Sequence, residues 1–181
     1  MAVPVTGSTQ PAAAALGRST LVLCVLATAG IVLQQELRTP LQLPGHRGLL
    51  WLGLLVAVRL VAARPGPALA VGMAAAGLTA GLGLSPDGPA GALPYLLAAG
   101  VLDATALVSW IRSRAWRIVL AAAPLHLVAL LVPISRSLLV GVGPVAVAQD
   151  LTTVALWHLC FGAGAGILGL ALASAWRLDR R

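Results

Sequence analysis

Apolar stretches recur along the whole chain, and short segments rich in Pro, Gly and charged residues separate them. Each stretch has about 20 residues, the length at which a helix rising 1.5 Å per residue crosses roughly 30 Å of hydrocarbon. We therefore expect an all-α membrane protein that folds as a compact bundle of six transmembrane helices. The predicted spans are about Ser19–Gln35, Gly48–Ala63, Pro67–Leu84, Ala92–Trp110, Ile118–Val140 and Leu151–Ala175.

The same pattern divides the chain into three parts. One transmembrane domain covers residues 19–175, because the connections between the apolar stretches are short. An N-terminal cytoplasmic segment, residues 1–18, precedes it, and a basic cytoplasmic tail, residues 176–181, follows it. The N-terminal segment lacks the basic start of a cleaved secretory signal, so we expect the first helix to remain as an anchor. Only the loop after that helix is long enough to fold over something.

The composition agrees with a lipid environment. Of the 181 residues, 59% are hydrophobic and 9% are charged, and the mean hydropathy is +0.96. Because an average soluble domain has about 25% charged residues, the composition excludes a water-soluble domain. We interpret the bias toward Ala, Gly, Leu and Arg as that of a GC-rich bacterial genome, and we expect a multi-pass protein of the bacterial cell membrane.

The arginines predict the orientation of the helices. All twelve basic residues are Arg, and cytoplasmic loops normally carry the excess of positive charge. Cytoplasmic termini leave Arg38, Arg47 and Arg136 outside, and we attribute the formal charge of +7 to topology rather than to a nucleic-acid partner. The same orientation puts nine arginines on or near the cytoplasmic side: Arg18, Arg59, Arg64, Arg112, Arg114, Arg117, Arg177, Arg180 and Arg181.

Polar and aromatic residues gather at the outer ends of the predicted helices. They predict an outward-facing pocket, lined by aromatic rings, that binds a small molecule. The alternative is that the Trp and Tyr residues form an interfacial belt while Arg and Asp extend into the headgroups. His158 favours the pocket, because a histidine inside a span normally faces the bundle or a cavity. The candidate residues are His46, Arg47, Trp51, Tyr95, Arg136, Gln149, Asp150, Trp157 and His158.

Three further polar residues fall inside predicted spans. Asp103 lies close to mid-membrane in the fourth span, and Arg59 lies at a comparable depth in the second. Pairing would lower the cost of burying each charge; the alternative is a protonated Asp103, or one lining a water-filled cavity, with a proton or substrate role. We expect His126, which follows Pro124 closely, to bond a carbonyl group that the proline leaves free.

Small residues recur at a spacing of four in three predicted spans, a pattern that lets helices approach closely. Such stripes pack the chain's own bundle or dock a separate subunit, and both interpretations stay open for the first stripe. Cys24 and Cys160 lack metal-type and redox-type spacing, so we expect structural thiols. The stripes are Thr20, Cys24 and Thr28, then Gly77 and Gly81, then Gly162 and Gly166.

The usual signatures of catalysis are missing from the chain. It has no His-Glu-x-x-His, no Gly-x-Ser-x-Gly and no Walker-type sequence. Its three His and five acidic residues are too scattered to favour a two-metal centre. We therefore expect no enzymatic activity, no metal and no cofactor, and any transport would need energy from elsewhere.

Two segments, together with the six spans and the inside termini, carry a family resemblance. TPLQLPGHRGLLWLGLLVAVRL contains the long outer loop, and YLLAAGVLDA contains an acidic residue. Over nearly its whole length the chain resembles the substrate-binding S component of energy-coupling factor (ECF) vitamin transporters. The resemblance implies an outward-facing pocket for a vitamin-like molecule, closed by the first loop. It also implies a coupling transmembrane subunit and two cytoplasmic ATPases, docked on Thr20, Cys24 and Thr28 in place of the family's Ala-x-x-x-Ala pattern.

Two other interpretations compete with uptake. The Gly and Ala stripes favour a non-catalytic structural or assembly subunit of a larger membrane complex. An intramembrane enzyme using Asp103 and a histidine has less support. Binding of a small molecule by the purified chain would distinguish uptake from assembly, because an assembly subunit needs no such ligand.

Overall fold

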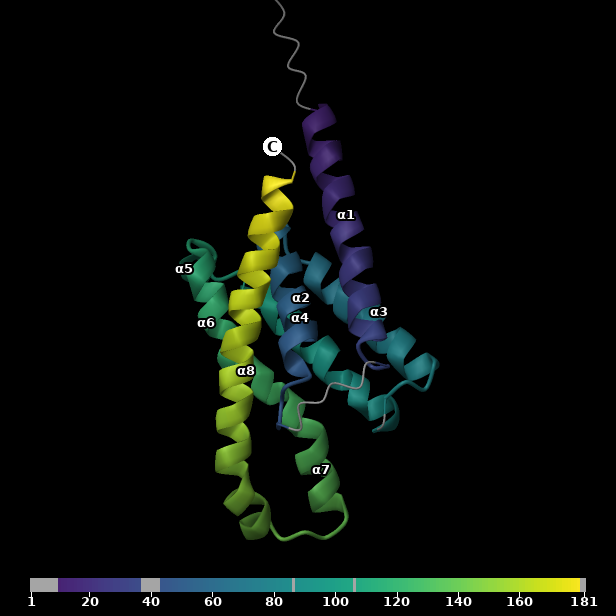
Figure 1. Cartoon of the computed structure of the whole chain (residues 1–181), viewed down its shortest axis with the longest axis vertical. Helices are drawn as coiled ribbons and strands as arrows, with labels where there is room; N and C mark the ends of the chain where they lie inside the picture. The colour runs from purple at the N-terminus through teal and green to yellow at the C-terminus, as the bar shows by residue number, and fades with distance from the viewer. Residues whose placement is uncertain (1–9, 37–42, 86, 106, 180–181) are drawn as a thin grey trace, which may run out of the picture.

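The computed structural model describes residues 10–36, 43–85, 87–105 and 107–179, apart from the side chains of residues 10–16, Arg112 and Asp150. All regular secondary structure in these ranges is helical, which confirms the all-α part of the predicted fold class (Figure 1). The elements are α1 (Gln10–Leu33), α2 (Gly48–Val61), α3 (Pro67–Gly81), the 3-10 helix η1 (Gly88–Ala92), α4 (Leu93–Thr105), α5 (Ser109–Arg112), α6 (Ala115–Leu125), the 3-10 helix η2 (His126–Leu130), α7 (Leu131–Leu139) and α8 (Pro144–Leu178).

The helices match the predicted segments in order but not in all their ends. Helices α1 to α4 follow the first four segments, and α8 contains the sixth. The fifth segment is divided into α6, η2 and α7, because Pro124 has no N–H to donate and the α-helix ends one residue later. Helix α8 begins at Pro144, earlier than expected, since proline fits the first turn of a helix.

Two stretches are long and apolar enough to cross a membrane, judged by length and composition. They are Ala115–Leu139, which joins α6, η2 and α7 over 25 residues, and Leu151–Leu178, which is 28 residues of α8. Shorter apolar helices of 10–17 residues cover Gly17–Leu33, Gly48–Val61 and Pro67–Gly81. Within the described residues, two stretches are thus candidates for membrane spans, and the six-span bundle stays a prediction.

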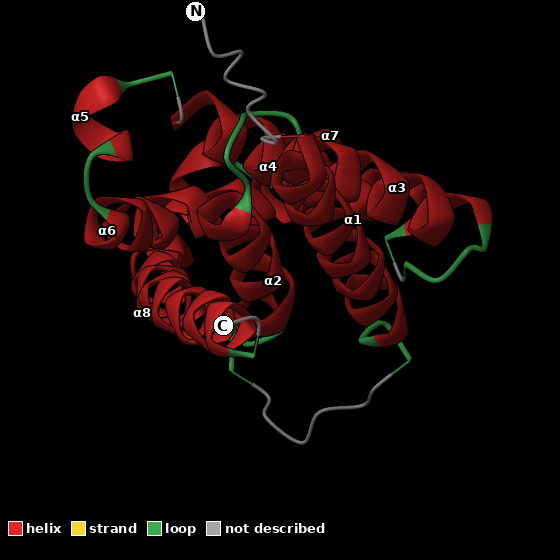
Figure 2. Cartoon of the chain, turned by 90° about the horizontal axis from the view of Figure 1, so that it is seen from above, coloured by secondary structure: helices red, strands yellow, loops and turns green. Residues whose placement is uncertain are grey.

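Helix α2 lies at the centre of the molecule. It packs most extensively on α8, and α1, α3, α4 and α6 also contact it. Viewed from above, α6 and α8 lie on one side of α2, while α1 and α3 lie on the other (Figure 2). The start of α1 and the end of α8 lie at the same end of the molecule (Figure 1).

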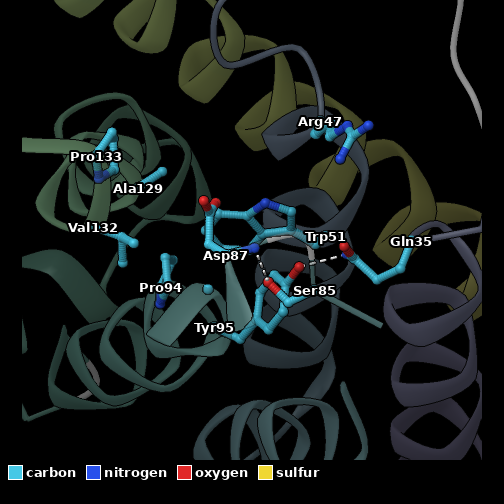
Figure 3. Close-up of a pocket in the computed structure, with 11 residues that line it drawn as sticks. Gln35, Arg47, Trp51, Ser85, Asp87, Pro94, Tyr95, Ala129, Val132 and Pro133 are labelled. Carbon is cyan, nitrogen blue, oxygen red and sulfur yellow. Dashed lines mark hydrogen bonds between the residues drawn. The ribbon is translucent and has the colours of Figure 1, made fainter. Parts of the chain in front are cut away.

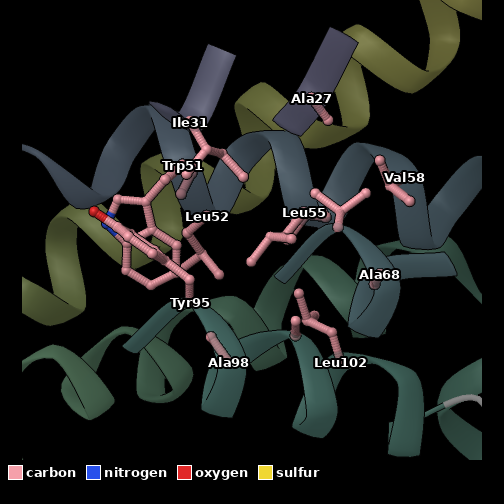
Figure 4. Packing of buried hydrophobic residues seen from close by; sticks show 14 of the residues in the cluster. Ala27, Ile31, Trp51, Leu52, Leu55, Val58, Ala68, Tyr95, Ala98 and Leu102 are labelled. Carbon is pink, nitrogen blue, oxygen red and sulfur yellow. The ribbon is translucent and has the colours of Figure 1, made fainter. Parts of the chain in front are cut away.

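The core forms around α2 because this helix is apolar on all sides, a pattern typical of a buried helix. Leu52 and Leu55 are fully buried in it. They lie between Ile31 of α1 and Leu102 of α4, which are also fully buried (Figure 4). Side chains from three helices therefore meet in one apolar cluster.

Glycine brings α8 into direct contact with the backbone of α6. A Cβ atom added at Gly162 would lie 2.7 Å from the carbonyl oxygens of both Ala122 and Ala123. The expectation that this stripe seats another helix is therefore confirmed. At Gly77 and Gly81 of α3, an added Cβ would meet nothing within 4 Å among the described residues. That second stripe seats no described helix.

Asp103 lies in the last turn of α4, whereas the predicted span placed it near the middle of a longer helix. The apolar composition continues to Trp110, but the helix ends at Thr105. The Oδ2 atom of Asp103 accepts a hydrogen bond of 2.7 Å from the backbone N–H of Leu69, in the first turn of α3. This N–H has no partner within its own helix, and a carboxylate is favoured at the positive end of a helix. Asp103 therefore caps α3 from a neighbouring helix.

Replacing Asp103 tests this cap. We expect Asp103→Ala to lower the free energy of unfolding by about 1–2 kcal/mol, because the partly buried N–H of Leu69 loses its acceptor. Asp103→Asn keeps an acceptor oxygen, and the other oxygen, Oδ1, has no hydrogen-bond partner to lose within the described residues. The Asn variant should therefore lose less than the Ala variant in denaturant titrations in detergent micelles. Equal losses in both would show that the negative charge matters rather than the cap.

Arg59 and Asp103 have different partners in the structure. The Nη1 atom of Arg59 donates to the carbonyl oxygens of Ala62, at 3.1 Å, and Arg64, at 3.4 Å. Arg177 of α8 donates to the carbonyl oxygen of Leu60. The last carbonyl groups of a helix lack partners and attract cations. Both arginines therefore stabilise the C-terminal end of α2, at the end of the molecule that carries the termini.

Candidate ligand pocket

A pocket of about 160 Å³ lies beside the end of α1 and the starts of α2 and α4, and Figure 3 shows its lining residues. Five segments meet there: the turn that follows α1, the start of α2, the turn before η1, the start of α4, and the η2–α7 region. The lining residues are Gln35, Arg47, Trp51, Ser85, Asp87, Gly91, Pro94, Tyr95, Ala129, Val132 and Pro133.

Trp51 and Tyr95 form the aromatic wall of the pocket. Their ring centroids are 5.3 Å apart in an edge-to-face arrangement, which is favourable for aromatic pairs. Only 4% of Trp51 and 6% of Tyr95 is exposed, so packing fixes both rings before any ligand arrives. Gln35 donates a hydrogen bond of 2.5 Å from Nε2 to the hydroxyl oxygen of Tyr95. This bond joins the end of α1 to α4 across the pocket.

The charged residues of the pocket differ in how they are paired. Asp87 accepts a hydrogen bond of 2.8 Å at Oδ1 from Nη1 of Arg136, an ion pair that joins the turn before η1 to α7. Both side chains are well exposed, so this pair contributes little to stability. It does neutralise Asp87, the one acidic residue among the described residues of the lining. Arg47 has no hydrogen-bond or ion-pair partner among the described residues, and its positive charge is available to a ligand.

Two histidines lie behind this wall. His126 donates from Nδ1 to the carbonyl oxygen of His158 at 2.9 Å, and His158 donates from Nδ1 to that of Val154 at 2.8 Å. The two imidazole centroids are 4.9 Å apart, and the Trp51 ring lies 5.7 Å from His126, edge to face. The expected bond from His126 to a carbonyl freed by Pro124 is therefore wrong, since its acceptor belongs to α8.

The histidine pair supports the turn that carries Arg47. A Cβ atom added at Gly48 would lie 1.6 Å from Nε2 of His126, and one at Gly45 would lie 3.1 Å from the His158 ring. Gly45 has a φ of 81°, a conformation that glycine adopts without strain. The glycines at both ends of this turn thus let the backbone rest directly on the imidazole rings.

The structure brings only part of the predicted set to the pocket. Arg47, Trp51 and Tyr95 line it, and Arg136 reaches it through Asp87. His158 is buried behind it, and His46 bonds the carbonyl oxygen of Leu43 within the turn, at 2.5 Å from Nδ1. The remaining candidates lie on the first half of α8: Gln149 is exposed, Trp157 stacks on Phe161 with centroids 5.9 Å apart, and the side chain of Asp150 lies outside the description.

Sequence reasoning missed Gln35, Ser85 and Asp87. The pair Gln34-Gln35 follows the apolar part of the first span, and polar amides there were a usable signal. The Ser85–Asp87 segment reads as a turn between spans, and nothing in its composition shows that it lies beside Trp51. A turn joining two neighbouring helices reaches a pocket only when the helix packing brings it there.

Cys24 and Thr28 of the predicted docking stripe line a second cavity. This apolar groove of about 410 Å³ runs between α1 and α3. Thr20, the third member of the stripe, is half-buried on the same helix. The groove is lined by Cys24, Val25, Thr28, Ala29, Ala70, Val71, Ala74 and Leu78.

Comparison of the chain with protein-family models, with curated proteins and with solved structures finds no match in any of the three. Within the described ranges, no three His, Cys, Asp or Glu side chains come close enough together to hold a metal ion. The groups that line the pocket are two aromatic rings, a carboxylate paired with Arg136, and the guanidinium of Arg47, and each can contact a bound small molecule.

Proposed function

We propose that this chain is the substrate-binding component of an ECF-type transporter, which captures a vitamin-like small molecule at the pocket between α1, α2, α4 and α7. The single observation that carries the proposal is the pocket itself, with its pre-packed aromatic wall and charged rim at one end of a helical bundle. Energy for uptake would come from partners, namely a coupling transmembrane subunit and cytoplasmic ATPases.

The apolar surface supports a multi-pass location in the membrane. Large apolar side chains project outward from four helices, and soluble monomers rarely expose contiguous apolar patches of large area. Contact of the same side chains with lipid carries no free-energy penalty. Examples that are each more than half exposed are Leu21, Val25, Met73, Leu120 and Ile167.

The arginine distribution supports an outward-facing pocket. Arg18, Arg64 and Arg177 belong to the end of the molecule that carries the start of α1 and the end of α8. The positive-inside rule assigns that end to the cytoplasm. The pocket, beside the other end of α1, would then face the outside, where a substrate for uptake is first met.

A second candidate function is an assembly subunit of a larger membrane complex. The observation that favours it is the apolar groove between α1 and α3, together with the face at Gly77 and Gly81, which no described residue covers. An assembly subunit needs no soluble ligand. Ligand binding by the chain alone therefore separates the two functions.

A blocking substitution tests the pocket. The chain is purified in mild detergent, and native mass spectrometry identifies a co-purifying small molecule or one acquired from a vitamin panel. We expect Val132→Trp, whose indole would occupy the pocket, to weaken binding by at least about tenfold, which is about 1.4 kcal/mol. Leu131→Trp, one residue earlier on α7 and exposed, is the matched control and should bind like the wild type.

Two results would contradict the uptake function. A wild-type chain that carries only lipid, before and after the vitamin panel, would favour the assembly subunit. Equal binding by both Trp variants would show that the ligand is held elsewhere on the chain.

A further inference from the structure

Arg47 occupies a position that helix electrostatics disfavours. It is the N-cap residue of α2 and makes no side-chain capping bond, and the first turn of α2 contains no acidic residue. The N-terminus of a helix carries a partial positive charge, so a cation there is repelled. Residues that lie against such an electrostatic preference, with no neighbouring group that offsets the cost, are found mainly at functional sites. An anion bound beside Arg47 would compensate it.

Two other polar side chains of the pocket are already engaged. Asp87 is neutralised by Arg136, and the amide nitrogen of Gln35 is used by Tyr95. Among the described lining residues, the charge of Arg47 is therefore the one without an ion-pair partner, and the N-terminus of α2 adds to it. A guanidinium binds a carboxylate through two parallel hydrogen bonds, which gives orientation as well as attraction.

The size and walls of the pocket limit the rest of the ligand. An apolar cavity of about 150 Å³ holds one benzene molecule, and this pocket measures about 160 Å³. Trp51 and Tyr95 present ring surfaces, and Pro94, Val132 and Pro133 add apolar contacts. Figure 3 shows Arg47 on one side of the pocket and Asp87 on the other, with Trp51 between them. One ring can therefore lie against Trp51 with its acidic group toward Arg47.

We propose that the pocket selects a small monocarboxylate that carries a single ring, with Arg47 as the partner of the carboxylate. This inference rests on the proposed function, because it names the substrate class of the same pocket. It makes Arg47, rather than Asp87, the residue that sets the charge of the substrate.

Three single-ring probes of similar size test the charge preference: benzoate, benzamide and benzylamine. Calorimetric titration of the detergent-purified chain should show benzoate binding at least about tenfold more tightly than the neutral and cationic probes. Arg47→Gln should remove this preference without lowering the thermal unfolding midpoint, since it takes a cation away from a helix N-terminus. Arg64→Gln, an exposed arginine at the opposite end, is the matched control and should keep the preference.

Each other outcome overturns the inference in a recognisable way. Preference for benzylamine would make Asp87 the selecting charge, and a benzoate preference that survives Arg47→Gln would reject the role of Arg47. If no probe binds while Val132→Trp still displaces a co-purified ligand, the substrate class is wrong but the uptake function stands. If neither a probe nor a co-purified ligand binds, both the substrate class and the uptake function fail.

Discussion

Gly48→Ala should be among the most damaging single-methyl substitutions in this protein, lowering the free energy of unfolding by about 3 kcal/mol. The added Cβ would overlap Nε2 of His126 at 1.6 Å. The His126 ring cannot rotate freely, because its Nδ1 donates to the carbonyl oxygen of His158 and the rings of Trp51 and His158 lie beside it. The displaced backbone also carries Arg47. Denaturant titration in detergent should therefore show lost stability, and titration with ligand should show lost binding.

A double variant separates this clash from other effects of the alanine. His126→Ala removes the ring that Gly48→Ala would strike, so the double variant should be no less stable than His126→Ala alone. The coupling free energy between the two substitutions then measures the contact directly. Additive losses would show that Gly48 matters for its own backbone conformation rather than for the space that His126 occupies.

The helical class and the order of the helices could be predicted from sequence, because apolar stretches and Pro/Gly turns are local signals. Helix ends were less predictable. Ala106 to Trp110 are mostly apolar, so composition gives no stop at Thr105, yet α4 ends there. The sequence after Pro144 is equally compatible with a loop and with a helix. In the structure these residues form the first turns of α8.

For the pocket, the sequence predicts how far along the molecule each residue lies, but it does not predict which helices lie side by side. Arg47, Trp51 and Tyr95 begin their helices at one end of the molecule, so their depth follows from their place in the chain, and they do meet at the pocket. Trp157 was assigned to the same end. In the structure it is 37% exposed and stacks on Phe161 of its own helix, and it does not line the pocket. Close packing at residues such as Gly162 decides which helices are neighbours. The hydrophobic pattern along the chain does not reveal these neighbours.

The second large effect is expected at Gly72, where α3 meets α4. A Cβ atom added there would lie 2.4 Å from the Cβ of Ala99 and 2.7 Å from the carbonyl oxygen of Tyr95. Backbone atoms cannot rotate out of the way as a flexible side chain can. We expect Gly72→Ala to lower the free energy of unfolding by about 2 kcal/mol, measured by denaturant titration in detergent. Because Tyr95 forms the aromatic wall, ligand binding should weaken as well.

Gly77→Ala is the matched control, since it makes the same change on the same helix. An added Cβ meets nothing within 4 Å there, and alanine favours helix over glycine by about 0.5–1 kcal/mol. The purified variant should therefore be at least as stable as the wild type and bind ligand equally well. Stability lost equally at both positions would reject the close contact of α3 with α4. A Gly77→Ala chain that is stable and binds ligand but fails in cells would instead indicate that this face meets a partner subunit.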